Sequence, residues 1–217
     1  MANEKFLTDY IEVDLSGLLT VTDPKIDAAH VHLNSDCRVY KDFGANYFDA
    51  LSVSWEAQVS SSSEQDGTGM MAGFANTLSN WYSFATTDLA HLIAKGVLST
   101  NDYIVMQRGR NQKTDTYSSL NDNTTYYMFT ARVAGNNTVT TEIYSDAAMA
   151  THLDTLSVDG FGVVKWQYAY GFNNHGYPAA GGAFYGFSQN MNLSAVPPTP
   201  PATAPTGHKF MSLLGVS

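Results

Sequence analysis

The sequence predicts an all-β fold in which two antiparallel sheets pack face to face as a sandwich. In many segments apolar side chains recur at every second residue, which is the period of a half-buried strand. Turn-forming residues separate these segments at short intervals. Charged residues make up only 14% of the 217 residues and aromatic residues 12%, so one domain of this length can bury a full core.

The clearest single pattern is a long β-hairpin between residues 120 and 156. Its first strand carries apolar side chains at alternate positions, namely Tyr127, Phe129, Ala131 and Val133. The opposite face of this strand carries Met128, Thr130 and Arg132. We expect the first set to pack on the core, because a half-buried strand turns its apolar face inward. Gly135, Asn136 and Asn137 supply the turn, since these residue types tolerate a positive φ.

The other elements are expected in order along the chain, after a polar lead-in over residues 1–9. Further strands are predicted at residues 10–14, 18–22, 26–33, 37–43, 47–59, 69–75, 102–108, 113–118, 163–172 and 182–193. One short helix is predicted at residues 88–96, because Leu89, Leu92 and Ile93 would share one helical face. Gln189 interrupts the apolar alternation of the last strand, which predicts a β-bulge there.

Charge and cysteine content exclude several classes of function. The net charge of −9 repels phosphate backbones, so nucleic acid is not an expected partner. Cys37 has no second cysteine to pair with, and we expect it to be a small buried residue of a strand. No apolar segment is long enough to span a membrane or to form a signal peptide at the N-terminus. We therefore expect synthesis and folding in a cytoplasm.

The composition changes after residue 193, which divides the chain into three parts. Residues 1–193 form the sandwich domain, residues 194–206 are a Pro-rich linker, and residues 207–217 are an apolar peptide. The apolar side chains of this peptide are Phe210, Met211, Leu213 and Leu214. Burying each would stabilise a complex by about 1.5–3 kcal/mol, so we expect the peptide to dock on a partner or a sister subunit. The alternative is that it folds back on its own domain.

Catalytic carboxylates are not arranged as a glycoside hydrolase needs them. Hydrolysis of this type uses a pair of carboxyl groups that flank the bond. Glu12 with Asp14, and Glu64 with Asp66, come nearest, but neither pair has the third carboxylate that a glucanase strand would carry. We expect no catalytic residues and no enzymatic activity.

Metal ligands are equally sparse. His30 and His32 share a strand face, but a zinc site needs further ligands and none is apparent nearby, so no metal site is predicted. The sequence leaves open whether a loop binds a structural calcium ion, and it does not locate such a site. Its candidate ligands are Asp36, Asp42, Asp102 and Asp122.

Aromatic side chains supply the candidates for sugar contacts. One stripe, formed by Trp166, Tyr168, Tyr170 and Phe172, is either a platform for sugars or, as we favour, one wall of the core. The better candidates for a glycan contact lie in loop regions and are Trp81, Tyr82, His175 and Tyr177. For these four residues too, plain packing under a loop is the interpretation that we favour.

Several segments resemble concanavalin A-like, laminin-G-like jelly rolls. The hairpin segments 123–127, 143–146 and 153–158, together with Arg132, are similar to the hairpin signature of that group. Residues 39–48 and 185–193 resemble segments of phage-associated proteins with this fold. The resemblance covers about residues 10–193. It implies a jelly-roll sandwich whose relatives bind glycans, bind proteins or cleave β-glucans.

The resemblance and the apolar peptide together lead to a functional expectation. We expect a structural protein of a virion (a capsid decoration protein, head fibre or tail fibre) that is attached through its C-terminal peptide. Its partners would be other virion proteins or sister subunits in a homo-oligomer. The alternative is a carbohydrate-binding module of a fibre or adhesin, with a cell-surface glycan as partner, and a glycoside hydrolase is least favoured.

Overall fold

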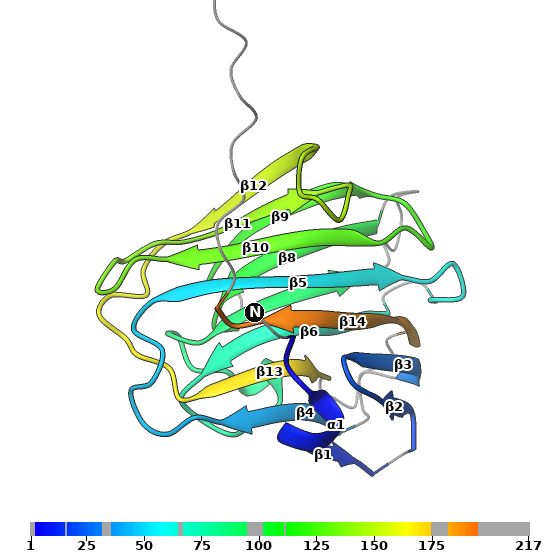
Figure 1. The fold of residues 1–217 in the computed structure, drawn as a ribbon, viewed down its shortest axis with the longest axis horizontal. Helices are drawn as coiled ribbons and strands as arrows, with labels where there is room; N and C mark the ends of the chain where they lie inside the picture. Colours follow the sequence, from blue (N-terminus) through cyan, green and yellow to red (C-terminus); the bar gives the residue numbers. More distant parts are fainter. Residues whose placement is uncertain are drawn as a thin grey trace, which may run out of the picture.

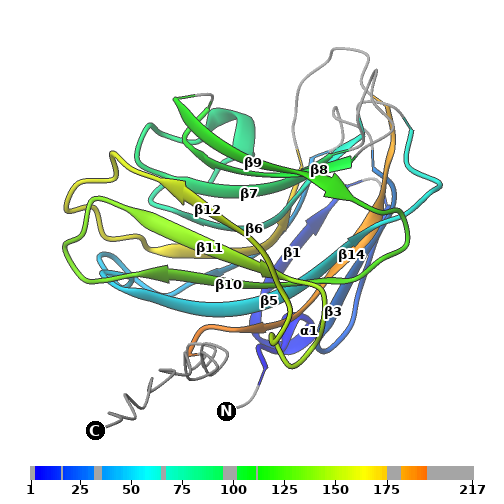
Figure 2. The same ribbon diagram turned by 90° about the horizontal axis from the view of Figure 1, so that it is seen from above.

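Two antiparallel sheets of seven strands each stack face to face, as the sequence predicts (Figure 1). The computed structural model describes residues 3–15, 17–31, 36–64, 67–94, 102–110, 112–174 and 182–194. Figure 2 shows the two sheets as separate layers, one with β7, β8 and β9 and the other with β10, β11 and β12. In the described residues the helical elements are α1 (Phe6–Asp9) and the 3-10 helix η1 (Trp81–Ser83). None of these helices is long and apolar enough to cross a membrane.

Sheet A and sheet B each combine strands that follow one another in sequence with strands from distant segments. The strands of sheet A are, in spatial order, β1 (Ile11–Asp14), β4 (Cys37–Asp42), β13 (Tyr168–Asn173), β6 (Thr68–Ala75), β7 (Leu89–Ala94), β8 (Asp102–Arg108) and β9 (Lys113–Leu120). The strands of sheet B are β12 (His152–Val158), β11 (Val139–Tyr144), β10 (Tyr126–Arg132), β5 (Leu51–Val59), β14 (Phe184–Asn192), β3 (Lys25–Val31) and β2 (Leu19–Val21). Both ends of the described chain therefore contribute to each layer.

The main hydrophobic core lies between the sheets. β5 shows the expected alternation most clearly, with five buried side chains, Leu51, Val53, Trp55, Ala57 and Val59. Burying each large side chain of this kind contributes about 1.5–3 kcal/mol. Cys37 is buried in β4 as predicted, and its thiol donates a hydrogen bond to Asp14 Oδ1 at 3.1 Å. Burial and this carboxylate raise the pKa of the thiol.

The helix predicted at residues 88–96 is wrong. Residues 89–94 form β7, which pairs with β6 on one side and with β8 on the other. All six side chains of β7 are buried. Because both faces of this central strand are covered, its apolar residues do not alternate, and a short apolar run of this kind cannot be distinguished from a helix by its period.

The one α-helix in the described residues is instead α1, in the segment expected to be a polar lead-in. Phe6 anchors it, being buried against Tyr10 with ring centroids 5.0 Å apart. Phe6 is the only buried residue of this four-residue helix, so the sequence shows no apolar helical period there.

The hairpin of β10 and β11 is confirmed, but its predicted inner face is wrong. The residues of β10 that point into the core are Tyr126, Met128, Thr130 and Arg132. Phe129 and Ala131 lie on the outer face of sheet B, in a small cluster with Tyr144. The pairing of Met128 with Trp55 places Met128 on the side of the inward-facing residues of β5, so long-range register decides the inner face.

Polar side chains of this hairpin are tolerated inside because they are hydrogen-bonded. The Arg132 guanidinium donates to the carbonyl oxygens of Asn136 at 2.9 Å, Val164 at 2.6 Å and Gly162 at 2.8 Å. It also stacks over the Trp166 ring, 4.6 Å from the centroid. A buried cation or hydroxyl with its hydrogen bonds satisfied carries little penalty.

β-Bulges change which side chains face the core. β14 is bulged between Gln189 and Asn192, which confirms the predicted bulge and turns Met191 inward. β13 is bulged between Tyr170 and Phe172, so the aromatic stripe does not lie on one face. Trp166 and Phe172 belong to the core between the sheets, whereas Tyr168 and Tyr170 belong to a second cluster on the other face of sheet A.

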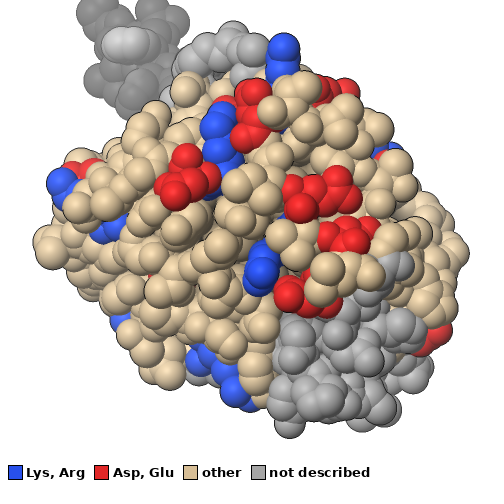
Figure 3. Space-filling model, turned by 90° about the horizontal axis from the view of Figure 1, so that it is seen from below, with Lys and Arg blue, Asp and Glu red and all other residues tan. Residues whose placement is uncertain are grey.

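The surface beside α1, β1 and β2 reflects the negative net charge. Figure 3 views the molecule from this side and shows acidic side chains spread over it, with basic side chains next to some of them. Lys41, for example, lies 3.3 Å from the carboxylate of Glu4 and 3.9 Å from that of Asp9. Exposed ion pairs of this kind contribute about 0–1 kcal/mol each and leave the surface acidic overall.

Candidate functional site

The outer face of sheet A, which is the face turned away from sheet B, is partly covered by the loop of residues 76–88 between β6 and β7. The loop places Trp81 and Phe84 on the sheet. The buried residues of this second hydrophobic cluster are Tyr40, Met70, Ala75, Trp81, Phe84, Ala90, Leu92 and Tyr170. The loop therefore has an apolar core of its own, separate from the core between the sheets.

Asp88 holds the two ends of this loop together. Its carboxylate accepts hydrogen bonds from the backbone N–H of Asn76 at 3.1 Å and of Ala85 at 2.9 Å. Burial raises the pKa of Asp88 to about 6, and the two N–H donors oppose that shift because they favour the charged form. The Trp166 indole adds a hydrogen bond from the core to the Thr87 carbonyl at 2.8 Å.

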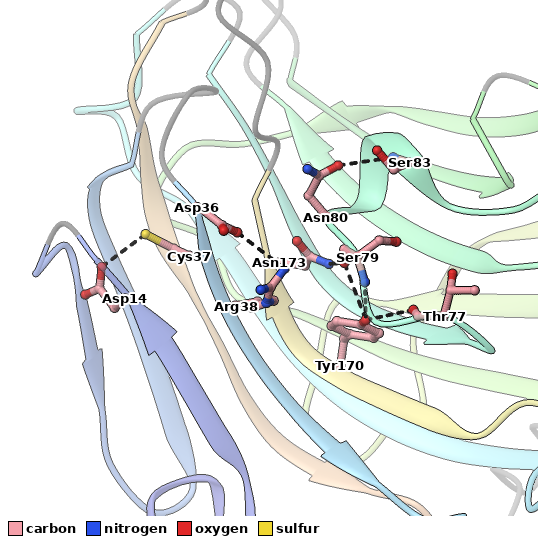
Figure 4. A network of polar contacts seen from close by, with 10 residues as sticks. All are labelled: Asp14, Asp36, Cys37, Arg38, Thr77, Ser79, Asn80, Ser83, Tyr170 and Asn173. Atoms are coloured by element: carbon pink, nitrogen blue, oxygen red, sulfur yellow. Dashed lines mark hydrogen bonds and ion pairs between the residues drawn. The ribbon is translucent and has the colours of Figure 1, made fainter. Parts of the chain in front are cut away.

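The middle of the loop is held by polar side chains that project from β13 (Figure 4). The Tyr170 hydroxyl donates to the Thr77 carbonyl at 3.2 Å, and the Asn173 amide donates to the Ser79 carbonyl at 3.0 Å. Asn80 then starts η1, because its side-chain oxygen accepts the backbone N–H of Ser83 at 3.1 Å. These contacts set the position of the next residue, Trp81.

A cavity of about 310 Å³ opens beside Trp81 on the outer face of β7, β8 and β9. Its described lining residues are Thr68, Trp81, Leu92, Ala94, Tyr103, Val105, Gln107, Thr114 and Thr116. None of these lining residues is charged. Two aromatic side chains, three threonine hydroxyls and one amide thus surround an apolar floor, which is the usual composition of a small-molecule site.

The strand register explains this composition. On β8, Tyr103, Val105 and Gln107 point outward because Ile104 and Met106 are buried in the core. Val105 pairs with Leu92 on one side and with Thr116 on the other. The cavity floor therefore changes from apolar over β7 to hydroxyl-bearing over β9.

The expected glycan-binding residues have different surroundings. Trp81 lines the cavity and is 8% exposed. Tyr82 is half-buried, and the Arg110 guanidinium covers one face of its ring at 3.2 Å from the centroid. His175 and Tyr177 lie outside the described residues, as do the expected docking residues Phe210, Met211, Leu213 and Leu214. Whether any of these residues contacts a ligand stays a prediction.

The sequence argument missed Tyr103, Gln107, Thr114 and Thr116. The alternation within residues 102–108 and 113–118 places each set on one strand face, which was the available signal. It could not show which face would be open, since that depends on where the 76–88 loop folds back.

Two other cavities have features that fit a ligand less well. One of about 520 Å³ lies between the edge strands β9 and β12 and contains the Lys113–Asp159 ion pair, so its charges are already matched. Another of about 340 Å³ lies on the outer face of sheet B, between Ser52, Phe129 and Thr140. Neither is lined by a tryptophan or by a glutamine, whereas the cavity on sheet A has both.

The residues considered as metal ligands have other partners in the described part of the chain. No group of three His, Cys, Asp or Glu side chains there is close enough to hold a metal ion. Of the calcium candidates, Asp36 lies 3.5 Å from Arg38, and Asp42 accepts the backbone N–H of Gly44 at 2.8 Å. Asp14, which the sequence analysis paired with Glu12 as a possible catalytic carboxylate, accepts a hydrogen bond from the backbone N–H of Leu19 at 2.7 Å.

Solved structures share this fold. The exoplasmic/lumenal domain of VIP36 in its Ca²⁺/Man2-bound form has a TM-score of 0.55 and 7% identity, covering 88% of this chain and 83% of that one. Lectin II from Ulex europaeus has a TM-score of 0.53 and 12% identity, covering 88% of this chain and 96% of that one. A protein of unknown function from Shewanella oneidensis MR-1 has a TM-score of 0.53 and 12% identity, with coverage of 88% and 83%.

The chain therefore has a lectin-like, concanavalin A-like sandwich fold. At identities this low, the shared fold does not carry over a ligand or a binding residue. No protein-family model matches the chain, and no curated protein matches it in sequence.

Proposed function

We propose that this protein is a carbohydrate-binding module, not an enzyme, and that it takes a neutral glycan in the cavity beside Trp81. The observation that carries the proposal is the cavity itself, which combines an aromatic wall with hydroxyl and amide groups and no charged lining residue. The lectin name of the Ulex europaeus neighbour and the mannose-bound form of VIP36 agree with a sugar-binding use of this fold.

The chemistry of a sugar fits such a lining. A pyranose ring has an apolar C–H face that packs on an aromatic ring, and its hydroxyl groups both donate and accept hydrogen bonds. Trp81 and Tyr103 offer the aromatic surfaces, and the threonine hydroxyls offer the hydrogen-bonding groups. A charged sugar would lose its hydration without gaining a partner of opposite charge, so the lining favours a neutral ligand.

The first test is a glycan array followed by calorimetry on the hits. Trp81→Ala should weaken binding at least tenfold, because it removes the aromatic wall. Tyr47→Ala is the matched control, since Tyr47 is an aromatic residue, 59% exposed, in a ring cluster with Phe43 and Phe48. Natively folded protein that binds no glycan on the array, or a Trp81→Ala variant with unchanged affinity, would contradict the proposal.

A place in a virion stays a prediction from the sequence. The residues expected to attach the protein, Phe210, Met211, Leu213 and Leu214, lie outside the described chain, and the structural neighbours do not test this role. A glycan-binding module of a fibre or adhesin would unite both expectations. In that case the sandwich would contact the cell-surface glycan and the C-terminal peptide would contact the particle.

A further inference from the structure

The floor of the cavity beside Trp81 contains a buried amide with unused hydrogen-bonding capacity. Gln107 is 3% exposed, and within the described chain its side-chain nitrogen has no hydrogen-bond partner. Buried polar groups in folded proteins are nearly always paired, so an unpaired donor in the lining of a cavity points to a ligand acceptor. The flexible glutamine side chain can turn this donor toward an acceptor that enters the cavity.

The neighbours of Gln107 restrict what that acceptor can be. Gln107 pairs across the strands with Ala90 of β7 and Thr114 of β9, so its amide lies between an apolar side and a hydroxyl side. Leu92 of β7 and Val105 of β8, which pair with each other, are the next outward-facing residues of these two strands and extend the apolar side. A ligand group that fits here needs a carbonyl-type acceptor, a small apolar part and a donor within a few ångströms of one another.

We propose that the preferred ligand is a sugar that carries an acetamido group, and that Gln107 donates a hydrogen bond to the acetamido carbonyl oxygen. The methyl group would pack on Leu92 and Val105, and the acetamido N–H would face Thr114. This inference rests on the proposed function, because it names the class of sugar for the same cavity.

Other substituents match this arrangement less well. A hydroxyl group in the same place would satisfy Gln107 but would lie against the apolar residues of β7 without covering them. A carboxylate would also accept from Gln107, but the lining residues offer no cation to balance its charge.

The experiment compares neutral ligands that differ only in this group, by calorimetry on the full chain. The pairs are chitotriose with cellotriose, and N-acetylgalactosamine with galactose, so that two ring configurations are covered. We expect the acetamido member of at least one pair to bind at least tenfold more tightly. Equal binding of both members in each pair would overturn the inference and leave the proposed function standing. No binding of any glycan would overturn the proposed function as well.

The role of Gln107 is tested by Gln107→Leu, which keeps a similar volume and removes the donor. The variant should lose the preference for the acetamido sugar, and its affinity for that sugar should fall at least tenfold. Gln58→Leu, the same substitution on a half-buried residue of β5 in sheet B, should change neither. A preference that persists in Gln107→Leu would overturn the assignment of this residue. If that variant does not fold, Gln107→Met serves the same purpose, and the ligand comparison on the wild type decides the sugar class by itself.

Discussion

His91 is the clearest case of a residue whose properties depend on its surroundings. It belongs to β7, and its ring lies fully buried between the sheets. Its Nε2 is 2.8 Å from Thr141 Oγ1 and 3.4 Å from Thr130 Oγ1, and its ring packs edge-on against Trp55. Burial lowers the pKa of His91 to about 3, because desolvation disfavours the imidazolium, and a hydrogen bond with the Ala72 backbone opposes this shift only in part.

This shift predicts a pH dependence of stability. The folded state holds His91 neutral, whereas the unfolded state takes up a proton below pH ~6.5. The stabilisation is therefore complete above that pH and is lost as the pH falls toward 3, by about 2 kcal/mol between pH 7 and pH 5. Urea unfolding of wild type and His91→Gln at both pH values measures this term as the difference between their pH dependences.

The comparison of wild type with His91→Gln is needed because Asp88 has the opposite effect on the pH dependence of stability. Its pKa of about 6 in the folded state lies above the unfolded value, so protonation of Asp88 adds stability as the pH falls through 6. If His91→Gln retains the full pH dependence of the wild type, His91 is not the group responsible.

At the scale of elements, the loop of residues 76–88 determines the candidate site. It positions Trp81 through contacts from three directions: Asp88 at its ends, Tyr170 and Asn173 from β13, and the apolar cluster beneath. Without this loop the outer face of β7 would be an open apolar surface. With the loop in place, part of that surface is covered and the remainder becomes the apolar part of the cavity floor.

Asp88→Asn tests this dependence. An asparagine keeps one acceptor oxygen, but its NH₂ group would face a backbone N–H donor of Asn76 or Ala85. We expect a loss of about 1–3 kcal/mol in the free energy of unfolding, because a buried donor is left unpaired. Glycan affinity should fall together with it, as the loop loosens around Trp81.

Asp27→Asn is the control for this substitution, because Asp27 is a partly exposed carboxylate on β3 that pairs with Lys25 at the surface. We expect both its stability and its glycan affinity to stay near wild type. An Asp88→Asn variant that binds glycan as tightly as the wild type would show that the loop ends do not control the site.

At the scale of the whole molecule, the described sandwich is complete at β14, which ends at Asn192. The neighbours of β14 are β5 and β3, so the last strand lies inside sheet B and closes the fold. The core residues found in the described chain come from residues 6–191. Removal of the C-terminal peptide should therefore leave the domain folded.

The mass in solution of the full chain and of a chain truncated after Leu193 tests the docking role of Phe210, Met211, Leu213 and Leu214. We expect an oligomer for the full chain and a monomer for the truncated one, because burying apolar side chains of this kind stabilises an interface. A monomer in both cases would contradict self-assembly through this peptide. A glycan affinity that survives truncation would separate ligand binding from assembly.

The sequence by itself determined the elements whose pattern is local. Apart from β7 and β12, alternating residues located the strands, including the hairpin of β10 and β11, because a strand has a fixed period of two. Gln189 marked the bulge of β14. The same local pattern could not identify β7, whose side chains are buried on both faces.

The tertiary structure alone decided which faces are buried and where a ligand can enter. It turned Met128 and Arg132 inward and Phe129 outward, and it separated Tyr170 from Phe172. It also brought Trp81 and Gln107 into the lining of one cavity. Each of these outcomes depends on pairing between segments that are far apart in the chain. Several such segments together bury each side chain, so no single stretch of sequence carries enough information to predict which face is buried.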